Sequence, residues 1–148
     1  MAVLARLVSH AGALRLLSLA MGVFLIFMSL DKIDWLWDAG ILTRRLQEWR
    51  GMARPFARWY LDTLALPGAP LFARVVPLAE LAAGTALILG MRVQLAAALA
   101  LLMIVNFHVA SDVIFRYDYL INGYGPPILG ALLALTTGGT RLPFSVSK

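Results

Sequence analysis

The chain has 148 residues, of which 61% are hydrophobic and only 14% are charged, and its mean hydropathy is +0.81. This composition is typical of an integral membrane protein. The absence of cysteine excludes disulfides, thiolate catalysis and thiolate metal sites within this chain. The formal net charge of +5 is carried by basic residues that flank apolar segments, which favours anionic lipid headgroups over nucleic acid as the charged partner.

Four apolar segments are candidates for membrane-spanning helices, because a span needs roughly 20 apolar residues. They cover residues 11–30, 71–89, 93–110 and 119–137. The connection at 90–92 is short, so the second and third spans should form an antiparallel hairpin, and no separate soluble domain fits between the segments. We therefore predict an all-α fold: one membrane domain over residues 1–148, built as a four-transmembrane-helix bundle.

The connection between the first two spans is long and rich in tryptophan and arginine. The first span ends at Asp31 and Lys32, which mark the expected water boundary, and Trp35 and Trp37 follow at headgroup depth. Residues 43–60 alternate basic side chains with apolar ones spaced by three or four, the pattern of an amphipathic helix lying in the membrane interface. Pro55 should kink or split this helix. The alternative is a loop packed over the mouth of the bundle. The residues expected to contact the membrane surface or a partner are Trp35, Trp37, Arg44, Arg45, Trp49, Arg54, Phe56 and Trp59.

Glu80 is a lone carboxylate in the second span. A charge at the bilayer centre costs about 2.5–3.5 kcal/mol on insertion scales, so such a residue is usually paired, protonated or turned toward a polar interior. Pro77, Glu80 and Gly84 are three and four residues apart and share one helical face. We therefore expect Glu80 to face the interior of the bundle.

Two interpretations of Glu80 stay open at this point. It is either a structural anchor, hydrogen-bonded to a backbone carbonyl or to Asn106, Tyr117 or Tyr124, or a carboxylate that handles protons or binds a ligand. Replacing Glu80 with leucine would remove a buried polar group together with its desolvation cost, which predicts a nearly neutral effect on folding.

His108 is the second intramembrane candidate. His108, Asp112 and Arg116 stand four residues apart and would form a hydrogen-bonded chain on one helical face. His108 is either a boundary histidine satisfied by Asp112, or a hydrogen-bond donor to a quinone oxygen, or, less favoured, an axial ligand of a haem or chlorophyll-type pigment. Counting residues places Glu80 and His108 at depths about 10 Å apart, so no shared metal site is expected.

The fourth span is irregular, because Gly125, Pro126 and Pro127 leave about a dozen helical residues, roughly 18 Å, against a hydrocarbon core of about 30 Å. Either residues 119–124 form a helical turn before a break, or the bilayer is thinned at this helix. Irregular backbone at membrane depth is tolerated only when buried in protein or lining a wet cavity. The candidate ligand-binding or proton-handling residues are therefore Glu80, His108, Asn106, Asp112, Tyr124 and Asn122.

Three stretches resemble the DoxX family of small four-helix membrane proteins. They are residues 22–32 (GVFLIFMSLDK), residues 77–90, which begin PLAELAAG and end ILG, and residues 135–145 (LTTGGTRLPFS). The resemblance spans most of the chain. It implies a membrane subunit associated with redox complexes, since the family name comes from a subunit of a thiosulfate:quinone oxidoreductase. Only Glu80, with Pro77 and Gly84, matches the family's most recognisable polar position.

The leading functional hypothesis is an accessory or quinone-facing subunit of a membrane redox complex, whose partner chains supply the electron carriers. The alternative is a structural interaction subunit with no ligand, and a small-solute transporter comes third. No nucleophile–base pair or phosphate loop is present, so catalysis by this chain alone is not expected. We expect lipids and other membrane subunits as partners and no nucleic acid. The sequence leaves the cofactor open: a quinone is one candidate, and a haem or chlorophyll-type pigment ligated by His108 is a less favoured one. The expected location is the bacterial inner membrane, with both termini in the cytoplasm.

Overall fold

The computed structural model describes residues 9–114, 116–140 and 142–146, and this part of the chain is helical with no β-strand. The all-α fold class is thereby confirmed. In chain order the elements are α2 (His10–Asp31), the short 3-10 turn η1 (Ile33–Leu36), α3 (Ala39–Met52), α4 (Pro55–Tyr60), the π-helical turn η2 (Leu61–Ala65), α5 (Leu66–Leu89), α6 (Val93–Ala110), α7 (Tyr117–Leu120) and α8 (Pro126–Gly138).

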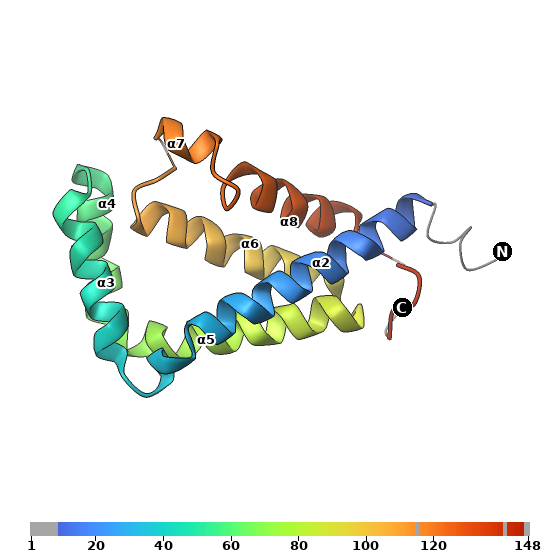
Figure 1. The fold of residues 1–148 in the computed structure, drawn as a ribbon, viewed down its shortest axis with the longest axis horizontal. Coiled ribbons are helices and arrows are strands. Elements are labelled where there is room, and N and C mark those ends of the chain that lie inside the picture. The colour runs from blue at the N-terminus through green and yellow to red at the C-terminus, as the bar shows by residue number, and fades with distance from the viewer. Residues whose placement is uncertain (1–8, 115, 141, 147–148) are drawn as a thin grey trace.

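The bundle is formed by α2, α5, α6 and α8, with α5 packed on α2 and α6, and α8 packed on α6 and α2 (Figure 1). Among the described residues, three helical stretches are long and apolar enough to cross a membrane: His10–Asp31, Pro55–Leu89 and Val93–Ala110. This is compatible with an integral membrane protein. The second stretch begins well before the predicted residue 71. The 13 residues of α8 extend about 20 Å and fall short of the hydrocarbon core.

Helices α2 and α5 approach closely where two glycines face each other. A Cβ atom built on Gly22 would lie 2.8 Å from the Gly84 carbonyl oxygen, and one on Gly84 would lie 2.8 Å from the Gly22 oxygen. Small residues allow such backbone approach between apolar helices. Two turns further along, the Ser29 hydroxyl donates to the Pro77 carbonyl at 2.8 Å. The face that carries Pro77, Glu80 and Gly84 is buried, as its spacing predicts.

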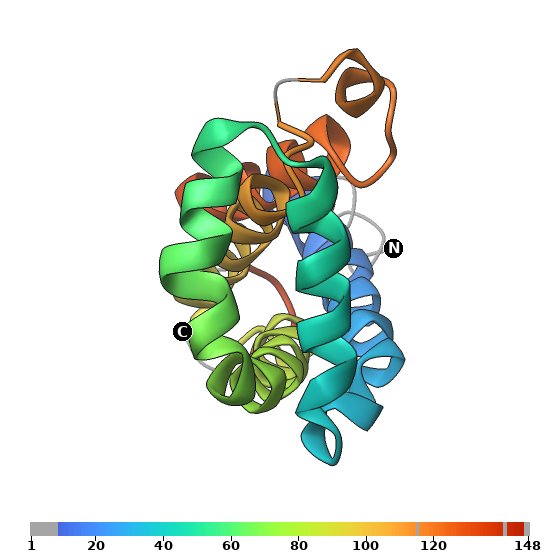
Figure 2. The same ribbon diagram turned by 90° about the vertical axis from the view of Figure 1, so that its left-hand side faces the viewer.

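Pro55 divides the segment predicted as one amphipathic helix over residues 43–60. Helix α3 ends at Met52 and α4 begins at Pro55, because proline fits the first turn of a helix but not its interior. Figures 1 and 2 show α3 and α4 side by side across one end of the bundle, nearly perpendicular to α2, α5 and α6. The break also divides the predicted apolar face, since Leu46 is buried whereas Phe56 and Trp59 are exposed.

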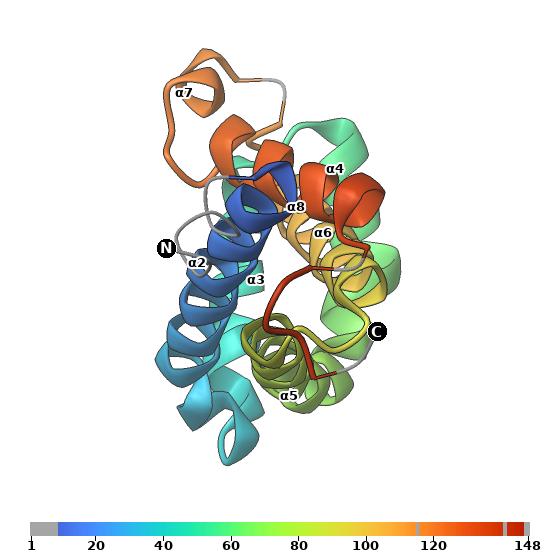
Figure 3. The same cartoon turned by 90° about the vertical axis from the view of Figure 1, so that its right-hand side faces the viewer.

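The opposite end of the bundle is closed by side chains and backbone near both ends of the described chain. Arg15 is buried and donates from Nη1 to the Leu87 carbonyl at 2.9 Å and from Nη2 to the Ile88 carbonyl at 2.6 Å. The Val146 amide donates to the Leu89 carbonyl at 3.0 Å. Figure 3 faces this end and shows the segment after α8 crossing toward α5. These bonds satisfy the last carbonyls of α5, which the helix itself leaves unpaired.

Candidate functional site

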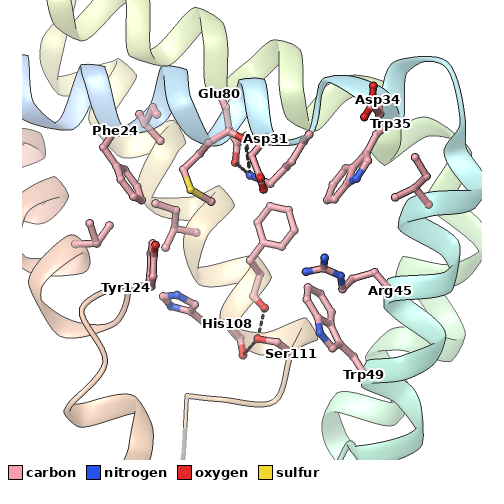
Figure 4. A pocket seen from close by; sticks show the side chains of 17 residues that line it. Phe24, Asp31, Asp34, Trp35, Arg45, Trp49, Glu80, His108, Ser111 and Tyr124 are labelled. Atoms are coloured by element: carbon pink, nitrogen blue, oxygen red, sulfur yellow. Dashed lines mark hydrogen bonds and ion pairs between the residues drawn. The ribbon is translucent and has the colours of Figure 1, made fainter.

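A cavity of about 370 Å³ lies between the bundle and α3 (Figure 4). Its walls combine aromatic and charged side chains that come from distant parts of the sequence. The aromatic ones are Phe24, Trp35, Trp49, Phe107 and Tyr124, and the charged ones are Asp31, Lys32, Asp34, Arg45 and Glu80. Two of the predicted candidates besides Glu80, namely His108 and Tyr124, also line it. The arrangement suits a ligand with a flat apolar body and a few polar atoms.

A buried ion pair forms the polar centre of the cavity. The Lys32 ammonium lies 3.0 Å from both carboxylate oxygens of Glu80, and the two side chains are only 8% and 3% exposed. The ammonium also donates to the Met28 carbonyl at 2.8 Å and lies 5.8 and 5.9 Å from the ring centroids of Phe107 and Trp35. Three acceptor oxygens, two from Glu80 and one from Met28, therefore lie within hydrogen-bonding distance of the ammonium.

The position of Lys32 differs from the expected water boundary. Side chains on a helix lean toward its N-terminus, so Lys32, which caps the end of α2, reaches back into the bundle to Glu80. Of the side chains expected as partners of Glu80, Asn106 accepts a hydrogen bond from the Tyr60 hydroxyl and Tyr117 is exposed. Tyr124 lines the same cavity as Glu80. The sequence did contain a signal for this pair. A buried carboxylate needs a cationic partner, and Lys32 is a cation at the end of the first span.

His108 is satisfied by the loop that precedes α8, and not by Asp112. Its Nδ1 lies 3.1 Å from the Tyr119 hydroxyl, their rings meet edge to face with centroids 5.1 Å apart, and a further hydrogen bond joins His108 to the Tyr124 backbone. The predicted chain from His108 through Asp112 to Arg116 is therefore wrong at its first link. This geometry favours a structural role for His108, which fixes the α7–α8 loop to α6.

Asp112 forms an ion-pair cluster that ties the α3–α4 junction to the end of α6. Its carboxylate accepts from the Arg54 amide at 3.1 Å, from Arg54 Nε at 2.9 Å and from Arg116 Nη2 at 3.2 Å. The hydrogen bond from the Arg54 side chain, opposed by burial, lowers the pKa of Asp112 to about 2. Asp112 thus has a structural role outside the cavity, where it holds the α3–α4 junction against the end of α6. Its spacing from His108 had predicted a ligand-binding or proton-handling residue.

Several residues expected at the membrane surface instead point inward. Trp35 is buried, and Trp49 packs edge to face on Phe107 with centroids 6.4 Å apart. In Figure 4 the guanidinium of Arg45 points from α3 into the cavity. The apolar periodicity of residues 43–60 correctly indicates a helix, but periodicity alone does not distinguish a face that packs on protein from one that contacts lipid.

The other surface candidates point outward. Trp37 is exposed, Arg44 lies 3.7 Å from the exposed Asp38, and Phe56 stacks on Trp59 with centroids 6.1 Å apart on the outer side of α4. These positions are open to lipid or to another protein.

The remaining candidate, Asn122, has a local role. Its side-chain oxygen accepts from the Tyr124 amide at 2.8 Å, which shapes the turn before α8. In the described part of the chain, no three His, Asp or Glu side chains lie close enough together to hold a metal ion. The site therefore rests on the cavity and on the Lys32–Glu80 pair.

Comparisons of this chain with protein-family models, with curated proteins and with solved structures find no match. The DoxX resemblance accordingly remains a hypothesis based on the three sequence stretches alone.

Proposed function

We propose that this protein is a small integral membrane subunit whose cavity holds the headgroup of a membrane-dissolved quinone, and that it works beside a partner subunit that carries the electrons. One observation supports this most directly: a buried ammonium–carboxylate pair lines an aromatic-walled cavity. A quinone ring is flat and apolar and carries carbonyl acceptors, so it complements such walls. The DoxX resemblance points to the same class of partner.

The roles of the cavity residues follow from their chemistry. Trp35, Trp49 and Phe107 provide π surfaces for a planar ring. Lys32 would donate an N–H to a carbonyl oxygen and would stabilise negative charge that develops there on reduction. Glu80 holds the ammonium in place and keeps the buried pair neutral, since an uncompensated charge in this position would be costly.

The membrane arrangement is part of the same proposal. We infer four spans, with α8 as a short fourth span, and α3 and α4 lying along the membrane surface. If α2, α5 and α6 run along the bilayer normal, the perpendicular α3 and α4 run in its plane (Figure 1). A straight helix over Pro55–Leu89 would measure about 50 Å, well over the hydrocarbon thickness. The exposed Phe56 and Trp59 beside Arg58 suit the headgroup layer.

The four tryptophans provide a binding assay, because quinones quench indole fluorescence. The protein would be placed in lipid nanodiscs and titrated with a short-tailed ubiquinone analogue. A Trp37→Phe, Trp59→Phe variant retains only the cavity tryptophans and should show saturable quenching. The matched Trp35→Phe, Trp49→Phe variant retains only the outer tryptophans and should show weak, non-saturating quenching. Equal, non-saturating quenching in both variants would reject quinone binding in the cavity.

A second candidate function, docking without a ligand, is favoured by the outer surface formed by the end of α3 and by α4. Met52, Phe56 and Trp59 are all exposed there, and the two aromatic rings stack on each other. If docking is the whole function, a protein partner should co-purify in stoichiometric amount in mild detergent, and Phe56→Ser with Trp59→Ser should release it. A co-purifying quinone with no protein partner would contradict this alternative.

A further inference from the structure

The end of α6 places a buried carboxylate beside two arginines. Asp112 has a positive φ of 56°, a conformation that aspartate adopts more readily than most residues. The Val113 amide donates back to the His108 carbonyl at 3.1 Å, which ends the helix in the manner of a Schellman motif. Asp112 is only 6% exposed and pairs with both Arg54 and Arg116, so the fold fixes the positions of these two guanidiniums.

A third arginine reaches the same place, the short connection between α3 and α4 (Figure 2). Arg58 Nη2 donates to the Ala53 carbonyl at 3.1 Å, and Arg116 Nη2 donates to the preceding carbonyl, that of Met52, at 3.3 Å. Arg54 is the next residue in this connection. Three side chains, which we call the arginine cluster (Arg54, Arg58 and Arg116), therefore gather at one place on the end of the molecule.

The arginine cluster keeps an excess of positive charge. It brings three guanidiniums to one carboxylate, and the C-terminal end of α6 adds roughly half a negative charge, which leaves roughly +1.5. Asp62, an acid on the neighbouring turn η2, is already paired with Arg50. In the described part of the chain, no acid lies within ion-pair distance of Arg58. The cluster is therefore suited to bind an anion from outside the chain.

Arg58 and Arg116 both have donors left for such an anion. A guanidinium carries five N–H donors in a planar fork, which matches phosphate oxygens two at a time. Among the described residues, Arg58 donates through Nη2 alone, and Arg116 donates through Nε and Nη2. Both residues are exposed. Because each side chain already has a fixed contact, less conformational entropy is lost when a phosphate binds.

The surface beside the arginine cluster is apolar. Met52, Phe56 and Trp59 are 69%, 63% and 61% exposed, and the rings of Phe56 and Trp59 stack on each other. A soluble phosphate compound would leave this surface uncovered, whereas a phospholipid carries hydrocarbon next to its phosphate. A zwitterionic lipid also carries a cation close to the phosphate, and the excess positive charge would repel that cation. The combination therefore favours an anionic phospholipid.

We propose that the arginine cluster binds the headgroup phosphate of an anionic phospholipid through Arg58 and Arg116, and that the first part of the acyl chains lies against the apolar surface beside it. Arg54 and Asp112 hold the site in shape. None of the three arginines lines the cavity, so this site is separate from the proposed quinone site. A lipid bound here would hold the α3–α4 end of the molecule in the headgroup layer.

Lipid retention, measured by native mass spectrometry, tests this site. The purified protein would be offered equal amounts of phosphatidylglycerol and phosphatidylcholine with the same acyl chains. Wild type should retain the anionic lipid at least about fivefold more, since one basic residue near the membrane surface contributes about that factor. Arg58→Gln with Arg116→Gln should abolish the preference. The matched control, Arg44→Gln with Arg74→Gln, removes the same charge from exposed arginines elsewhere and should keep it.

The fluorescence of Trp59 in a single-tryptophan protein gives a second measurement. Brominated phosphatidylglycerol should quench it more than brominated phosphatidylcholine does at the same low mole fraction. Inorganic phosphate should relieve this quenching no more than chloride of the same ionic strength does.

Four outcomes would overturn the proposal. Equal retention of the two lipids by wild type would mean that the cluster is not selective, and equal loss of preference in both double variants would mean that only net charge matters. Relief of quenching by inorganic phosphate but not by chloride would assign the cluster to a soluble phosphate. A bound protein that is released by Arg58→Gln with Arg116→Gln, with no lipid retained by wild type, would assign the surface to protein docking. None of these results depends on the quinone titration.

Discussion

Removing Glu80 alone should destabilise the fold strongly, because it would leave the Lys32 ammonium buried without its counter-charge. Breaking one partner of a buried ion pair typically costs about 3–5 kcal/mol, and both side chains here are nearly inaccessible to solvent. An upper limit comes from the alternative of releasing a lysine proton to water at pH 7, which costs about 5 kcal/mol. We therefore expect Glu80→Leu to lower the free energy of unfolding by about 3–5 kcal/mol. This reverses the nearly neutral effect that the sequence alone predicts.

The double variant Lys32→Met, Glu80→Leu separates the pair from its individual charges. Replacing both partners with apolar residues removes both desolvation costs, so its stability should lie within about 1 kcal/mol of wild type or above it. Glu80→Gln keeps an acceptor for Lys32 and should cost an intermediate amount, about 1.5–3 kcal/mol. The coupling energy from this cycle should be several kcal/mol, because the two residues share one contact.

The assay is reversible unfolding in mixed detergent micelles, followed by circular dichroism. The cycle also needs the single variant Lys32→Met. All five proteins, namely wild type, Glu80→Leu, Lys32→Met, the double variant and Glu80→Gln, must first show the same helix content before denaturant is added. Two results would refute the reasoning: a Glu80→Leu variant as stable as wild type, or a double variant destabilised by the full total of the two single changes. Either result would mean that the Lys32–Glu80 pair is not formed in the folded protein.

Three further predictions test other parts of the structure. Because the pKa of Asp112 is held at about 2, below its ordinary 3.8, its ion pairs stabilise the fold fully above about pH 4 and lose this effect as the pH falls toward 2; thermal melts of Asp112→Asn should lack that acid-dependent loss. Gly22→Ala should lower the free energy of unfolding by about 1–3 kcal/mol, because the added carbon meets the α5 backbone. In the control Gly130→Ala the added carbon meets nothing within 4 Å, so this change should be neutral or slightly stabilising, and equal unfolding midpoints for the two variants would contradict the prediction. In a variant with Trp59 as the single tryptophan, brominated lipids should quench fluorescence more than aqueous iodide does, and the opposite order would place α4 away from the membrane.

Much of the fold could be predicted because it depends on residues close together in the sequence. The predicted third span, 93–110, coincides with α6, and the first span differs from α2 by one residue at each end. The break at Pro55 and the late start of α8 at Pro126 also follow from local rules of proline geometry. The fourth span and the surface position of α3 and α4 stay predictions, because they concern a membrane and not the chain itself.

The content of the cavity was decided by the tertiary structure. Composition and spacing identified Glu80 as a buried acid with an inward face, but its partner lies 48 residues away. That pairing depends on how α2 and α5 are aligned against each other, and the alignment is set by the Gly22–Gly84 approach and the Ser29–Pro77 hydrogen bond. Helical periodicity reports which face of a helix is apolar. It does not report which residue of another helix stands opposite, and for that reason Lys32, Trp49 and Arg45 entered the site only with the folded structure.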